Sequence, residues 1–404
     1  GPTCTHRPQL MFLAVLIALS LNSLMATKQR VVILGGGIHG VSTAYQLALK
    51  GVPSLIIEKT SIAAAASGKA GGFLARNWGS GPTVQLHERG FDMHKQLATT
   101  LGVESYRQVD TLNVDGNHKG ANVASWLDRK VTSSLMDRDT AQVTPLELTQ
   151  KMLAAAQKQC EGVEVLIDSA EGLQVEGDKV TGVRTKSSGV ISASQVVICL
   201  GPWSGVAVED WLGLSLPMQG VKSTSLVYAD LDSVRQEPYA CFCAEDPNHC
   251  HLELYPRPDG SLYVCGLGGS DYVSGDRLRA GGDCESASLV GPDPSRVEAA
   301  SRSLRGMAGW ADREPDVSQA CMRPCLPDAQ PAMGVVPGVG GVYISAGHNC
   351  WGILWAPVCG LLMAELLAGG QSSVDLRAFS PGRYMQQAGK RGRQRGQAQV
   401  GEQW

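Results

Sequence analysis

The feature that most constrains this chain is a strand, a glycine-rich turn, a helix and a second strand, in that order, near residue 30. The apolar run at 31–34 predicts a buried parallel strand, and the pattern G-x-G-x-x-G follows it at once, at 35–40. Apolar residues at helical spacing come next, and a second apolar strand at 55–58 ends in Glu58. A strand, glycines, a helix, a strand and an acid in this order predict a dinucleotide-binding βαβ unit.

Each part of this unit has its own physical reason. Gly35 permits the tight turn, Gly37 lets the backbone approach a pyrophosphate, and Gly40 lets the helix pack closely on the strand. The helix N-terminus offers free N–H groups and a partial positive charge to the phosphates. Glu58 accepts hydrogen bonds from ribose hydroxyls and disfavours NADP, because an acid repels a 2′-phosphate. The residues expected to bind the dinucleotide here are Gly35, Gly37, Ile38, His39, Gly40, Glu58 and Lys59.

Composition supports a nucleotide-binding α/β protein and excludes several other classes. The 48 glycines among 404 residues exceed the usual share and suit many tight turns. Charged residues make up 18% of the chain, too few for a coiled coil, and hydrophobic residues make up 43%, too many for a disordered protein. A net charge of −3 gives no general signature of nucleic-acid binding, so no nucleic-acid partner is expected.

The cysteines do not form a recognisable framework. Twelve are spread along a large chain, unlike a small disulfide scaffold. In the one cluster, Cys241, Cys243, Cys250 and His251, the C-x-C spacing and the adjacent last pair differ from zinc-site spacing. We therefore expect free thiols and no metal.

The two ends of the sequence differ from the rest. Residues 1–28 are expected to be a leader with an apolar segment at 10–26, which is too short to span a bilayer. It has the form of a signal-peptide core, and a transit segment or a poorly ordered leader is the open alternative. A basic tail at 379–404 is expected to be flexible and solvated. Membrane association stays open, and an intracellular or organellar location is favoured.

Three later motifs favour FAD over NAD. A small-residue segment at 61–75 follows the second strand, where it would let backbone N–H groups approach a cofactor; a flexible surface loop is the alternative. A strand at 194–205 breaks into a Gly-Pro-Trp turn. Residues 341–370 then give a strand, a Gly-His turn and a long apolar helix.

The order of these motifs resembles the D-amino acid oxidase superfamily of FAD-dependent oxidoreductases, nearest its glycine oxidase and sarcosine oxidase branches. A-S-G-x-x-x-G-F-L is similar to that family's second cofactor loop, and GHNCWGILWAP is similar to its C-terminal flavin loop. The expected hairpin LELYPRPDGSLYVCG, at 252–266, is especially like a group of FAD-dependent oxidoreductases from fungi, plants and algae. The further residues that the resemblance assigns to FAD are Ser67, Gly68, Ala70, Gly71, Gly72, Phe73, Gly201, Trp203, Cys321, Gly347, Cys350, Trp351, Gly352 and Ile353.

The resemblance also implies a substrate site. Arg323-Pro324 matches the Arg-Pro that holds the substrate carboxylate in glycine and D-amino acid oxidases, and a guanidinium suits two parallel hydrogen bonds. An interdomain salt bridge is the alternative for Arg323. Cys321 matches the cysteine that carries FAD as a thioether in sarcosine oxidases, and a buried free thiol is its alternative. His348 and Tyr255 are the other catalytic candidates, with structural roles as the alternative.

What the resemblance implies as a whole is an α/β fold with two domains. A Rossmann-like FAD-binding domain of the glutathione reductase type is expected from 29–80, 141–208 and 318–378, and an α+β substrate domain with an antiparallel sheet from 81–140 and 209–317. The implied reaction oxidises the C–N bond of an amino acid or secondary amine by hydride transfer to flavin N5, with molecular oxygen as acceptor and hydrogen peroxide as product. A flavoprotein with an assembly or trafficking role and little turnover is the alternative.

Overall fold

The computed structural model describes residues 30–116 and 121–385, so the predicted leader and most of the predicted tail lie outside it. The first sheet is built around β1 (Val31–Leu34), which lies between β2 (Ser54–Glu58) and β12 (Val196–Ile198). The order is β19-β20-β12-β1-β2-β8, parallel except for the edge strand β19. The remaining strands of this sheet are β8 (Glu164–Ile167), β19 (Ala332–Val335) and β20 (Val342–Ala346). The expected α/β fold with a parallel sheet is confirmed.

Alternate residues of β1 pack on the two faces of this sheet. Val31 and Ile33 pack with three helices, and Val32 and Leu34 pack toward a small antiparallel sheet. Both faces are therefore covered, which explains the unbroken apolar run of the strand. The helices are α2 (Ile38–Leu49), α5 (Pro145–Gln159) and α10 (Gly352–Leu367), and the small sheet is β9 (Ala170–Glu176), β10 (Lys179–Thr185) and β11 (Val190–Ser192).

Helix α10 is apolar enough to raise the question of a membrane. Among the described residues, 349–367 form the single helical stretch with the length and composition to cross a bilayer. Of that stretch, 67% is buried inside the fold. It packs against α2 and α4 (Val84–Leu101). Its hydrophobicity is thus accounted for by its place in the core.

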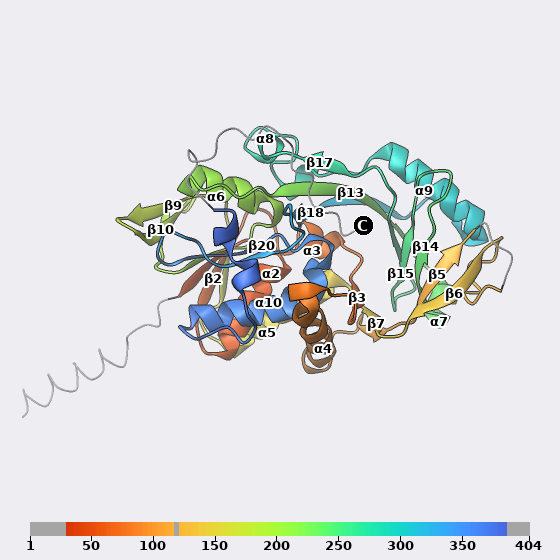
Figure 1. The fold of residues 1–404 in the computed structure, drawn as a ribbon, viewed down its shortest axis with the longest axis horizontal. Coiled ribbons are helices and arrows are strands. Elements are labelled where there is room, and N and C mark those ends of the chain that lie inside the picture. Colours follow the sequence, from red (N-terminus) through yellow and green to blue (C-terminus); the bar gives the residue numbers. More distant parts are fainter. Residues whose placement is uncertain (1–29, 117–120, 386–404) are drawn as a thin grey trace, which may run out of the picture.

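The second sheet is mostly antiparallel and lies on the other side of the molecule (Figure 1). Its order is β17-β13-β16-β15-β14-β5-β6, and β18 pairs with β13. Helix α9 (Pro294–Met307) packs on one face. The strands are β5 (Thr111–Asp115), β6 (Thr132–Asp137), β13 (Gln219–Tyr228), β14 (Ala240–Cys243), β15 (Glu253–Pro256), β16 (Leu262–Cys265), β17 (Asp271–Val273) and β18 (Val317–Cys325).

Strand β18 contains the first residues of 318–378, the third segment that the sequence analysis assigns to the FAD-binding domain. All nine of its residues pair with β13, from Val317 opposite Val227 to Cys325 opposite Gln219. Hydrogen bonding therefore places β18 in the second sheet, although the strands that follow it belong to the first. This pairing brings Cys321 and Arg323 to the space between the two sheets.

Shorter elements connect the two sheets. A small sheet of order β3-β7-β4 joins Phe73–Ala75, Thr140–Gln142 and Arg107–Gln108. The remaining helices are α3 (Ala66–Lys69), α6 (Ser204–Leu212), α7 (Asp232–Gln236) and α8 (Gly275–Leu278).

Candidate functional site

One cavity of about 750 Å³ is lined by residues of both sheets. From the first sheet, its walls include Glu58, the last residue of β2, and Asp168, which follows β8. From the second sheet they include Tyr255 and Arg323. Ligands of open α/β sheets bind beyond the carboxyl ends of the strands, which is where Glu58 lies. The dinucleotide turn and the predicted substrate residues thus share a single space.

The glycine turn has the geometry that its sequence predicts. Gly35 has a φ of +104°, and a Cβ at Gly40 would lie 2.1 Å from the Gly35 carbonyl oxygen. Gly37, Ile38 and His39 line the cavity at the start of α2. The Ile38 N–H donates to Ser67 Oγ at 2.8 Å, so the second loop caps this helix start.

Glu58 is held in place by the backbone around it. One carboxylate oxygen accepts from the Gly36 N–H at 2.8 Å, and the other accepts from the Thr60 N–H at 2.9 Å. The second of these, Oε1, also accepts from the Thr60 hydroxyl at 3.1 Å, so Oε2, with one described donor, is the oxygen that keeps a lone pair for a ribose hydroxyl. Lys59 also lines the cavity, and its Nζ donates to the Glu285 carbonyl at 3.1 Å.

The second predicted cofactor loop contains a short helix, α3, and is fixed by packing. A Cβ at Gly71 would lie 2.5 Å from the Tyr255 ring, and a Cβ at Gly72 would lie 1.8 Å from the Val143 carbonyl oxygen. The cavity is lined by Ser67, Ala70, Gly71, Gly72 and Phe73 of this loop.

Three predicted cofactor residues, Gly40, Gly68 and Gly347, are not among those lining the cavity. Gly40 is required by helix packing, as above, and a Cβ at Gly68 would lie 2.2 Å from the Ala63 carbonyl oxygen. Gly347 has a φ of +85° and faces the Leu326 side chain. These glycines shape the turn and the loops around the cavity, and their assignment to the cofactor site stays a prediction.

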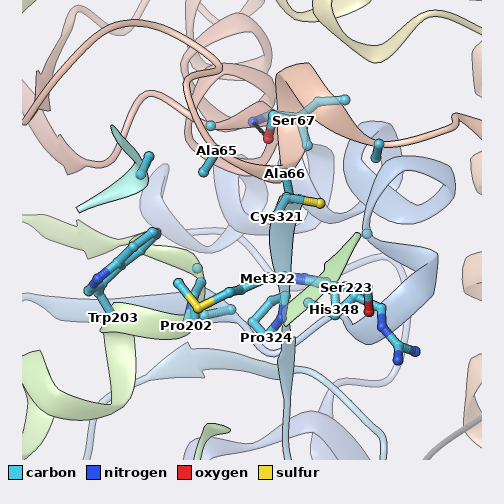
Figure 2. A pocket seen from close by; sticks show the side chains of 18 of the residues that line it. Ala65, Ala66, Ser67, Pro202, Trp203, Ser223, Cys321, Met322, Pro324 and His348 are labelled. Carbon is cyan, nitrogen blue, oxygen red and sulfur yellow. Dashed lines mark hydrogen bonds between the residues drawn. The ribbon is translucent and has the colours of Figure 1, made fainter. Parts of the chain in front are cut away.

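The Gly-Pro-Trp turn lies at the edge of the cavity. Gly201 has a φ of +56°, and both it and Trp203 line the cavity. Trp203 Nε1 donates to the Cys284 carbonyl at 3.0 Å, which ties this turn to the segment after α8. Figure 2 shows Trp203 and Pro202 beside Met322, close to the strand that carries Cys321.

Two imidazoles meet where the glycine turn and the C-terminal loop converge. The rings of His39 and His348 stack with their centroids 3.5 Å apart and their planes 12° apart. Burial lowers the pKa of His39 to about 3, and burial together with the neighbouring His39 lowers the pKa of His348 well below its usual range. Both rings are therefore neutral at pH 7.

The same pair lies near Cys359, and His39, His348 and Cys359 place possible metal-ligand atoms within 4.8 Å of one another. Nearly parallel stacked rings direct their lone pairs side by side rather than toward one point. A tetrahedral ion needs converging lone pairs. We therefore assign no metal to this group.

The rest of the C-terminal loop closes the cavity. Cys350, Trp351, Gly352 and Ile353 line it as α10 begins. The helix N-terminus brings a partial positive charge to this wall of the cavity.

Arg323 lies on β18 and faces this loop. Its Nη1 donates to Asn349 Oδ1 at 3.4 Å, and Asn349 Oδ1 also accepts from Cys325 Sγ at 3.2 Å. Among the described residues, no carboxylate oxygen lies within 4.0 Å of the Arg323 guanidinium. The described part of the chain thus shows no interdomain salt bridge at Arg323, and the guanidinium is left facing the cavity.

Cys321 lies two residues before Arg323 on the same face of β18. Figure 2 shows its side chain beside Ala66 and Ser67 of the second loop. Burial raises the pKa of the Cys321 thiol to about 11, although Lys69 and Arg323 act in the opposite direction.

Tyr255 belongs to an aromatic wall that the sequence did not predict as a unit. Its ring is parallel to that of Phe73, with centroids 5.1 Å apart, and Phe242 and Trp78 pack against the same Phe73 ring. The Tyr255 hydroxyl donates to the Glu253 carboxylate. Glu253, Phe242, Trp78 and Asn349 also line the cavity and were missed. Of these four residues, Glu253 could have been predicted from the sequence. It lies two residues before Tyr255 in an expected strand, so the two side chains share a face of that strand.

The fold and this cavity define a class of protein, an α/β protein with a dinucleotide-binding turn and a second sheet that lines the same cavity. The chain belongs to the DAO family of FAD-dependent oxidoreductases, whose profile matches residues 30–366. It is an FAD-dependent amino acid or amine oxidoreductase.

Some relatives match most of this chain and others match about half of it. A glycine oxidase from Pseudomonas aeruginosa is 25% identical over 393 residues, which is 87% of this chain and 98% of the relative. A D-amino acid dehydrogenase from Cereibacter sphaeroides is 29% identical over 220 residues, which is 53% of this chain and 44% of that protein. Among solved structures, the L-amino acid deaminase from Proteus myxofaciens has a TM-score of 0.74 at 19% identity and covers 90% of this chain and 95% of its own. The glycine oxidase from Bacillus cereus has a TM-score of 0.72 at 22% identity, with 89% and 98% covered.

Proposed function

We propose that this protein oxidises the C–N bond of an amino acid or secondary amine, with molecular oxygen as the electron acceptor and hydrogen peroxide as the product. The observation that carries the proposal is Arg323. It lines the same cavity as the glycine turn and the C-terminal loop, and no carboxylate among the described residues neutralises it. A substrate carboxylate is the partner that a guanidinium in such a place selects.

The residues present fit FAD. Gly37 lines the cavity at the start of α2, and a Cβ there would lie 3.2 Å from Ser67 Oγ, a tight contact that glycine avoids. The turn, Glu58 and the start of α10 all face the one cavity. When bound, FAD supplies a two-electron acceptor that takes a hydride from the carbon beside the substrate nitrogen.

The chain's own residues then bind, orient and shield the substrate. Arg323 holds the carboxylate, and its hydrogen bond to Asn349 fixes the guanidinium beside the C-terminal loop. The rings of Phe73, Phe242 and Tyr255 form an apolar wall that excludes water. The N-terminus of α10 stabilises negative charge that develops at its end of the cavity.

His348 supports this arrangement without exchanging a proton. It is neutral and buried, and it stacks on His39, so it holds the C-terminal loop against the glycine turn. Loss of hydride and a proton leaves an imine, which water hydrolyses to a carbonyl compound and ammonia or an amine. No strong acid or base is needed at the site.

The test is anaerobic mixing of the FAD-loaded protein with a panel of amino acids and N-methyl amino acids. Bleaching of the yellow flavin by at least one of them, followed by peroxide release when air is admitted, is expected. If an artificial dye reoxidises the reduced flavin and oxygen does not, the electron acceptor is not oxygen, and the protein acts as a dehydrogenase. No bleaching with any member would favour the alternative of an assembly or trafficking role.

A further inference from the structure

The substrate cavity contains a second charged group, the carboxylate of Glu253 on β15, that neither the sequence motifs nor the proposed reaction uses. Its side chain is only partly buried. Among the described residues, no lysine, arginine or histidine nitrogen lies within 4.0 Å of it. The carboxylate therefore faces a cavity without a cationic partner from the described chain.

Hydrogen bonds hold this carboxylate in a defined orientation. The Tyr255 hydroxyl and the Cys265 thiol both donate to Oε2, the latter at 3.4 Å. These two donors fix the position of Oε2 relative to β15 and β16. No described residue donates to Oε1, so this oxygen is left for a ligand.

Glu253 and Arg323 line the same cavity. Burial is the main reason why the pKa values of the Cys265 and Cys350 thiols are raised, but both charges also act on both thiols. Glu253 raises these pKa values and Arg323 lowers them, so each charge lies within electrostatic reach of the same two side chains. The two opposite charges do not pair with each other within 4.0 Å.

We propose that Glu253 binds a cationic group of the substrate that is distinct from the reacting amine, so that the preferred substrates are basic amino acids with a second, protonated nitrogen. This inference rests on the proposed function, because it requires Arg323 to hold the carboxylate. An unpaired anion in a partly desolvated cavity gains most from a ligand cation. The aromatic wall beside Glu253 adds favourable contact for such a cation.

The first test measures binding without turnover. The FAD-loaded protein is titrated with 4-aminobutanoate, 5-aminopentanoate and 6-aminohexanoate, and with the matching unaminated acids, while the flavin absorbance spectrum is followed. At least one amino acid of this series is expected to bind about tenfold more tightly than its unaminated partner. Glu253→Gln is expected to abolish that difference, and Glu253→Asp to retain part of it. Glu245→Gln, which removes an exposed carboxylate outside the cavity, is the matched control and leaves the difference intact.

The second test uses flavin reduction. Lysine, ornithine and arginine are expected to reduce the flavin with a higher kcat/KM than norleucine, and Glu253→Gln to lower that preference about tenfold or more. An equal loss for lysine and norleucine in Glu253→Gln would mean that Glu253 acts on the reacting amine, which overturns the inference. Reduction by neutral amino acids alone would overturn it while leaving the proposed function intact. No reduction by any amine would instead remove the proposed function.

Discussion

The imidazole rings of His39 and His348 lie face to face, with their centroids 3.5 Å apart, although the two residues come from the N-terminal and C-terminal parts of the chain. His39 belongs to the glycine turn that starts the first helix, and His348 belongs to the loop that starts α10. Their contact therefore fixes two helix N-termini relative to each other. Those two helix starts line the cavity that we propose for the flavin.

This buried pair predicts a loss of stability in mild acid. The native pKa of each ring is lowered, to about 3 for His39, so between about pH 6.5 and that value the unfolded chain binds protons that the folded chain does not. The stabilisation is complete above about pH 6.5 and falls by up to about 1.4 kcal/mol per pH unit for each ring as the pH decreases. Thermal unfolding at pH 7, 6 and 5, with saturating FAD, is expected to show a falling Tm.

Two variants make this prediction specific. His39→Asn removes a titrating group from the pair and is expected to flatten the dependence of Tm on pH. His249→Asn removes a histidine whose side chain is 83% exposed, and it is expected to leave that dependence unchanged. Identical slopes in the parent protein and both variants would show that the stacked rings titrate like exposed ones.

Arg323→Ala is expected to weaken the binding of substrates that carry a carboxylate. Removing one member of a buried charge pair costs about 2–5 kcal/mol, so kcat/KM is expected to fall by at least about 30-fold, mainly through KM. Arg323→Lys keeps the charge but loses the planar donor pair, and it is expected to recover only part of the loss. Arg302→Ala on α9, which breaks an exposed pair with Glu298, serves as the control. An unchanged KM in Arg323→Ala would identify Arg323 as a structural residue.

The local parts of the site could be predicted from the sequence. The βαβ unit depends on residues within one stretch, and so does the hairpin of β15 and β16, whose turn contains Gly260 at a φ of +85°. The approach of Arg323 to Asn349 could not be predicted, since it depends on β18 pairing with β13 of the other sheet. The close approaches of Gly68 to the Ala63 carbonyl oxygen and of Gly72 to the Val143 carbonyl oxygen could not be predicted either, because they depend on how the second loop folds and packs.

Gly40→Ala is expected to prevent FAD binding. Its new Cβ would lie 2.1 Å from the Gly35 carbonyl oxygen, so the turn must open before α2 can form. The purified variant is expected to be nearly colourless and to have a lower Tm than the parent. Gly306→Ala in α9 adds the same methyl group where no heavy atom lies within 4 Å, and it is expected to stay yellow. A yellow Gly40→Ala protein with the parent's flavin content would contradict the predicted role of this turn.

Cys321 is predicted to carry FAD as a thioether. Its side chain faces the cavity beside the second loop, and the nearby Lys69 and Arg323 favour the thiolate that covalent attachment needs, against the effect of burial. Acid precipitation of the parent protein is expected to leave the yellow colour in the pellet, and Cys321→Ser to release it into the supernatant. Cys160→Ser, which alters a cysteine outside the cavity, is the control and keeps the colour in the pellet. Colour in the supernatant of the parent itself would leave Cys321 as a free buried thiol, and the flavin would then be held by the two glycine-containing loops, Glu58 and the start of α10 alone.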